Sequence, residues 1–145
     1  MKKAWALIFV MTSLALAGLV GSAQHPPLLQ ASEAWIKQLP PVIRVRAGYV
    51  IIQNQDSRPH RLVGASSPAF ERIQMHRTLI DGGRMKMVRA EHFSIPAKGT
   101  LTLAPGGRHL MMFSPRRPLP AGSEVPVTLR FADGSELTVP FRVRP

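Results

Sequence analysis

The chain has 145 residues, a length that suits one domain rather than two. Its formal net charge is +11 at pH 7, and it contains no cysteine. The lack of thiols excludes a catalytic cysteine, a zinc ribbon, a blue-copper thiolate and a disulfide, so the fold must depend on its apolar core.

A secretory signal peptide is predicted for residues 1–23. Two lysines precede an apolar run over residues 4–20, and small residues ending at Ala23 offer a cleavage site. We therefore expect a periplasmic protein whose mature chain begins at Gln24 and forms one domain over residues 24–145. The alternative is an uncleaved anchor, because the apolar run reaches the lower limit for a membrane span. A lipid-modified cysteine anchor is excluded for a chain without cysteine.

The basic charge would suit a nucleic-acid ligand, but export argues against one. The arginines are scattered, and the longest run is the pair Arg116-Arg117. A basic surface that meets anionic lipid or an acidic protein is the better interpretation.

From Val45 onward the pattern is that of short strands separated by turns. The predicted extended segments are residues 46–54, 60–67, 70–80, 84–93, 100–107, 108–113, 125–131 and 137–143.

Two hairpins stand out among these segments. The turn Asp81-Gly82-Gly83 joins residues 70–80 to 84–93, and Asp133-Gly134 joins the last two segments, in which every second residue is apolar. Fourteen prolines and eleven glycines between short strands argue against long helices. We therefore predict an all-β protein, an antiparallel β-sandwich or barrel.

All methionines beyond the leader lie between residues 75 and 112, together with two histidines. They are Met75, Met85, Met87, Met111, Met112, His76 and His109. In a strand, residues two apart project to the same face, so His109 and Met111 project together, as do Met85 and Met87. His76 lies on the strand that would pair with Met87 across the Asp81 turn.

Thioether sulfur is soft and binds Cu(I) readily, and imidazole strengthens such a site. The binding of Cu(I) should weaken at low pH, because a protonated imidazole cannot ligate. Methionine is also a common filler of small β-domain cores. The pattern alone therefore leaves copper binding and ordinary packing equally open.

The spacing of four of these residues resembles the signature of the PCu(A)C family of periplasmic copper chaperones. Ten residues separate His76 from Met87, twenty-one separate Met87 from His109, and Leu110 separates His109 from Met111. The resemblance implies a cupredoxin-like, Greek-key β-sandwich that binds Cu(I) through these four side chains.

The resemblance also implies a role. The protein would be a monomeric metallochaperone that delivers Cu(I) to the copper centre of cytochrome c oxidase, often alongside a thiol-bearing assembly protein. The sequence shows no acid/base pair, nucleophile elbow or phosphate loop, so we do not expect an enzyme. The alternatives are copper storage or buffering, a redox protein, and a β-sandwich interaction module without metal.

Two departures from the family pattern affect the metal sites. Arg77 occupies the place where the family usually has an acidic residue after its first histidine. The chain stops at Pro145 without the Met- and His-rich tail that binds a second copper ion in some members. A mature amino terminus at Gln24 followed by His25 would offer a weak Cu(II) site.

The other methionines and histidines have simpler interpretations. Met85 is either a spare thioether at the rim or a packed neighbour of Met87. Met75 and Met112 should point away from the site into the core. His60 and His92, near turns, should be solvated.

Overall fold

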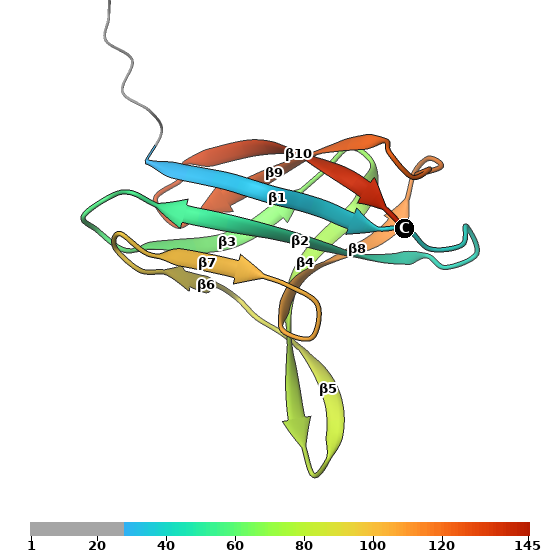
Figure 1. The fold of residues 1–145 in the computed structure, drawn as a ribbon, viewed down its shortest axis with the longest axis horizontal. Coiled ribbons are helices and arrows are strands. Elements are labelled where there is room, and N and C mark those ends of the chain that lie inside the picture. The colour runs from blue at the N-terminus through green and yellow to red at the C-terminus, as the bar shows by residue number, and fades with distance from the viewer. Residues whose placement is uncertain (1–27) are drawn as a thin grey trace, which may run out of the picture.

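The computed structural model describes residues 28–145 and shows a β-sandwich with one protruding hairpin (Figure 1). The predicted signal peptide, its cleavage point and the Gln24–His25 site lie outside the described residues. Over residues 28–145 the chain forms no helix, and so none that could cross a membrane.

Ten strands make up the sandwich. They are β1 (Leu29–Lys37), β2 (Val45–Asn54), β3 (His60–Ser66), β4 (Phe70–Asp81), β5 (Arg84–Arg89), β6 (Phe93–Ile95), β7 (Thr100–Leu103), β8 (Arg108–Pro115), β9 (Glu124–Phe131) and β10 (Glu136–Arg144). Their order is β5-β4-β8-β2-β1-β10-β9-β3-β6, and β7 pairs with β2. The predicted β-sandwich is confirmed, and so are the predicted strands from β2 onward with one exception. The segment predicted over residues 84–93 is divided, because β5 ends at Arg89 and Phe93 begins β6, a separate strand that pairs with β3.

The core lies between the two layers of this curled sheet. Met112 of β8 and Phe141 of β10 are both fully buried and meet beside Gly48 of β2. A Cβ added to Gly48 would lie 2.5 Å from Met112 Cε, so the glycine makes room for this methionine in the core. The prediction that Met75 and Met112 are core residues is confirmed, with exposed fractions of 4% and 0%.

The sequence prediction missed β1 and with it the only parallel pairing within the described residues. β1 runs parallel to β10, with Ile36 opposite Val143, so the sheet is mixed rather than wholly antiparallel. Glu33 has a φ of 51°, and the register of β1 against β2 shifts between Ser32 and Trp35. This bulge inserts one residue and reverses the alternation of buried side chains, which hides the strand in the sequence.

The turn between β4 and β5 is a two-residue hairpin loop. Asp81 pairs with Arg84, and both Gly82 and Gly83 have positive φ, at 54° and 77°. Two central residues with positive φ define a type I′ turn, which favours glycine and matches the twist of the flanking strands. The hairpin therefore extends beyond the body of the sandwich (Figure 1).

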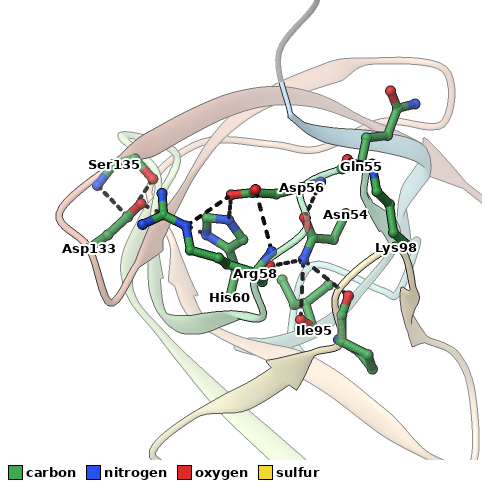
Figure 2. Close-up of polar contacts among 10 residues, drawn as sticks. Asn54, Gln55, Asp56, Arg58, His60, Ile95, Lys98, Asp133 and Ser135 are labelled. Carbon is green, nitrogen blue, oxygen red and sulfur yellow. Dashed lines mark hydrogen bonds and ion pairs between the residues drawn. The ribbon is translucent and has the colours of Figure 1, made fainter.

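A buried polar cluster ties the β2–β3 connection to neighbouring loops (Figure 2). Asn54 Nδ2 donates hydrogen bonds to the carbonyls of Arg58 at 2.8 Å and Pro96 at 3.0 Å. His60 Nε2 donates to Asp56 Oδ2 at 2.9 Å, and the His60 side chain is 13% exposed. The prediction that His60 is solvated is wrong, because Asp56 holds its ring against the protein; His92 is exposed, as predicted.

The hydrogen bond from His60 lowers the pKa of Asp56, although partial desolvation opposes it. A carboxyl whose folded pKa lies below its unfolded value of about 3.9 stabilises the fold above that value. This stability is lost as the pH falls through the folded pKa.

We therefore expect Asp56→Asn to lower the melting temperature most near pH 7. The difference from the native protein should shrink below about pH 4, where the native carboxyl is itself protonated. Thermal unfolding followed by circular dichroism from pH 7 to pH 2 measures this. A difference that stays constant over the whole range would contradict the assignment.

Candidate metal centre

The two histidines of the predicted site lie directly opposite each other on neighbouring strands. In the antiparallel pair of β4 and β8, His76 is the partner of His109, and Gln74 is the partner of Met111. Directly opposite residues project to the same face of a sheet. The two imidazole rings accordingly lie side by side, with 5.9 Å between their centroids and 45° between their planes.

Each imidazole has one nitrogen in a hydrogen bond and one without a partner. His109 is 4% exposed, and its Nδ1 donates to the Gly107 carbonyl at 3.2 Å. His76 Nε2 donates to Gln74 Oε1 at 3.1 Å. His109 Nε2 and His76 Nδ1 are buried and have no hydrogen-bond partner within the part of the chain that the structure describes.

These hydrogen bonds assign the tautomers. A ring nitrogen that donates carries the proton, so the other nitrogen of each neutral ring presents a lone pair. A buried acceptor without a partner is costly, and a histidine whose second nitrogen is fixed by a carbonyl is the usual arrangement of a metal ligand. The site thus presents two oriented lone pairs from adjacent strands.

The surroundings keep His76 neutral. Burial lowers the pKa of His76, and the nearby His109 and Arg89 lower it further. Arg89 is the partner of His76 in the β4–β5 ladder and therefore projects to the same face. A neutral ring keeps its lone pair available to a metal at lower pH than a free histidine would.

The two predicted thioethers lie on either side of the histidines. Met111 follows His109 by two residues on β8 and is half-buried between Gln74 of β4 and Ala47 of β2, its partners on the two neighbouring strands. Met87, on β5, is the partner of Thr78, which shares a face with His76. All four predicted side chains therefore project from one face of β5, β4 and β8.

Met87 differs from the other three in its exposure. Its side chain is 54% exposed on the outermost strand, whereas His109 is buried and His76 and Met111 are half-buried. Met85, on the same face and nearer the turn, is 72% exposed, so it is not a packed neighbour of Met87. The three candidate ligands on β4 and β8 are thus held by their neighbours, whereas Met87 on the hairpin is open to solvent.

Sequence reasoning missed three residues on this face. Gln74 orients His76, the Phe113 ring lies 6.4 Å from the His76 ring, and Arg89 faces His76 across the β4–β5 ladder. Each lies two residues from a predicted ligand on the same strand. The two-residue period of a strand would have found all three.

Arg77, the departure from the family pattern, projects to the other face. It is exposed and is the partner of Val88 on one side and Arg108 on the other. Arg89, and not Arg77, therefore lies on the face of the candidate metal centre, directly opposite His76.

Across residues 28–145, no three or more His, Asp or Glu side chains come together as a metal-binding group. The donors available at the centre are the two imidazoles and the thioethers.

Comparison with solved structures shows that the fold is that of PCuAC domains. The copper-bound PCuAC domain from PmoF2 superposes with a TM-score of 0.69 at 23% identity, covering 83% of this chain and 96% of that domain. The solution structure of CuI-DR1885 from Deinococcus radiodurans has a TM-score of 0.63 at 37% identity, covering 84% and 81%.

The chain belongs to the LpqE-like family. The family model described as "Putative lipoprotein LpqE-like" matches residues 29–143. A "Putative lipoprotein Lxx21020" of Leifsonia xyli subsp. xyli is 38% identical over 141 residues, covering 89% of this chain and 84% of the relative. An "Uncharacterized protein RP573" of Rickettsia prowazekii is 32% identical, covering 92% and 79%. The PCu(A)C resemblance of the sequence is confirmed.

The tautomers can be tested without metal. In the apo protein at neutral pH we expect ¹⁵N NMR to find the His109 proton on Nδ1 and the His76 proton on Nε2. Exposed His92 is the matched control, and its ring should show the mixture of tautomers of a solvated histidine. A His109 ring protonated on Nε2 would leave no lone pair to face His76 and would contradict the assignment.

Proposed function

We propose that this protein binds one Cu(I) ion through His76, His109, Met111 and Met87. One observation carries the proposal: two unpartnered imidazole nitrogens lie on facing residues of adjacent strands, with a thioether on each side. Neutral nitrogen and thioether ligands suit a soft monovalent ion and have little attraction for Mg²⁺. A neutral ligand set also leaves the positive charge in place, which favours the reduced ion.

The arrangement of the four ligands suits transfer of the ion. His76, His109 and Met111 come from the paired strands β4 and β8, which the core holds in place. Met87 comes from the outermost strand of an exposed hairpin. An incoming ligand can therefore replace Met87 first, while the other three still hold copper.

The comparisons support copper as the bound ion and support export of the protein from the cytoplasm. The PmoF2 domain and DR1885 were solved with copper and Cu(I), and DR1885 is 37% identical to this chain. The family description names lipoproteins, which are exported, and the sequence predicts a signal peptide.

We therefore propose a periplasmic metallochaperone that carries Cu(I) to the copper centre of a respiratory oxidase, such as cytochrome c oxidase. A thiol-bearing assembly protein would act alongside it. The role is binding and transfer rather than catalysis. Copper buffering and a metal-free interaction module are the alternatives that the experiments below distinguish from delivery.

A methionine series separates ligands from core residues. We expect Met87→Ala and Met111→Ala each to weaken Cu(I) binding by at least about tenfold, since each removes one metal–ligand bond, with little change in stability. Met112→Ala should retain Cu(I) and lose about 2–5 kcal/mol of stability, because it leaves a cavity in the core. Competition with a Cu(I) chelator and urea unfolding measure the two effects.

Met85→Ala is the matched control, a methionine on the same strand and face as Met87 with greater exposure. It should change neither quantity by much. Retention of full affinity in both Met87→Ala and Met111→Ala would refute these two residues as ligands, and a wild-type protein that binds no Cu(I) would favour a metal-free interaction module.

The experiment for delivery offers the Cu(I)-loaded protein to an apo oxidase copper domain. Direct exchange should move copper faster than the protein releases it to a dilute chelator, and the rate should rise with acceptor concentration. A rate equal to spontaneous release would indicate buffering instead.

A further inference from the structure

A pocket of about 480 Å³ lies at the end of the sandwich formed by the β1–β2 loop and the segment that follows β8. Figure 1 shows this loop at the end where the C-terminus lies, away from the tip of the β4–β5 hairpin. Four arginines line the pocket, together with leucines and prolines: Arg44, Arg46, Arg116 and Arg117.

The charge of these arginines is not neutralised by the protein. Within the described part of the chain, ion pairs involve the cations Arg58, His60 and Arg144, none of which lines this pocket. Arg116 and Arg117 each donate one long hydrogen bond to a carbonyl, at 3.4 and 3.5 Å. Most of their guanidinium donors are therefore available to a ligand.

Arg46 fixes the shape of the loop beside the pocket. It is 5% exposed, and its guanidinium donates to the carbonyls of Leu39 at 3.2 Å and Val45 at 3.1 Å, and also to that of Ile43. These neutral acceptors satisfy its donors but leave its charge in the wall of the pocket. Burial, and to a lesser extent Arg44, lowers the pKa of Arg46, as an uncompensated cation requires.

The apex of the same loop is apolar and exposed. Ile43 N donates to the Pro40 carbonyl at 2.9 Å and closes a turn, which holds Val42 outward. Val42 is 81% exposed and Ile43 is 43% exposed. Apolar side chains that project beside a cluster of arginines form the pattern of a membrane-surface contact.

We propose that this end of the protein binds the surface of an anionic phospholipid membrane. The guanidinium groups of Arg44, Arg116 and Arg117 would bind lipid phosphates, and Val42 and Ile43 would enter the interface. The predicted export brings the protein to such a membrane. The tip of the β4–β5 hairpin lies away from this end, so a docked protein still presents Met87 to a partner.

Co-sedimentation with vesicles of phosphatidylcholine, with and without phosphatidylglycerol, tests the proposal. The wild type and all variants are prepared in the exported form, so that any contribution of the N-terminal region to vesicle binding is the same in each. The wild type should prefer the anionic vesicles. Each arginine near an anionic surface contributes roughly fivefold, so R44Q/R116Q/R117Q should bind them about 100-fold more weakly.

Two matched controls test whether the loss of vesicle binding is specific to this end of the sandwich. R61Q/R84Q/R130Q removes three exposed arginines that form no ion pair within the described residues and do not line the pocket, and it should bind several-fold more tightly than the pocket variant. Val42→Ser should weaken binding, while Ile80→Ser, on a residue 78% exposed on the hairpin, should not. Melting temperatures and Cu(I) binding of all variants should match the wild type.

Four results would overturn the proposal. Equal losses in the two arginine triples would assign the binding to diffuse charge. Complete release by millimolar glycerol phosphate would assign the pocket to a soluble phosphate. Equally tight binding to polyglutamate, lost in the pocket variant, would assign it to an acidic protein. The fourth is no preference of the wild type for anionic vesicles.

Discussion

The pairing of β4 with β8 is the constraint on which the candidate metal centre depends. It places His76 opposite His109 on one face, while Met75 and Leu110 are opposite each other on the buried face. A slip of one residue would turn the histidines toward the core and these apolar side chains away from it. The free energy of burying Met75, Leu110 and Met112 therefore also orients the two imidazoles, and the core and the site are specified by the same register.

The same sheet carries both a rigid and an accessible part of the site. Three proposed ligands lie on strands held by the core, and the fourth lies on a hairpin that the type I′ turn at Gly82 and Gly83 extends into solvent. Binding requires fixed donors, because loose ones must be ordered by the ion. Transfer requires one donor that a partner can reach. The strand order β5-β4-β8 places the accessible donor on β5 next to the fixed donors on β4 and β8.

Two clusters of polar and charged groups lie outside the site, one at the β2–β3 connection and one beside the β1–β2 loop. Asn54, Asp56 and His60 satisfy one another and nearby carbonyls, so this cluster stabilises loops (Figure 2). The arginines beside the β1–β2 loop form no ion pair within the described residues, which leaves their charge available to the proposed membrane surface. Four of the nineteen basic residues thus gather at one pocket, which a net charge of +11 does not reveal.

Apart from β6, which was not distinguished from β5, the sequence by itself determined the strands from β2 onward, both hairpins and the four candidate ligands, because alternation and turn residues are local signals and the ligand spacing is a family signature. It did not reveal β1, whose alternation the bulge at Glu33 reverses, or the contact of His60 with Asp56. Only the tertiary structure decided that Gln74 and Gly107 orient the imidazoles, that Arg89 rather than Arg77 faces the site, and that four arginines surround one pocket. These facts depend on strand pairing and loop approach between residues far apart in the chain, which no local pattern encodes.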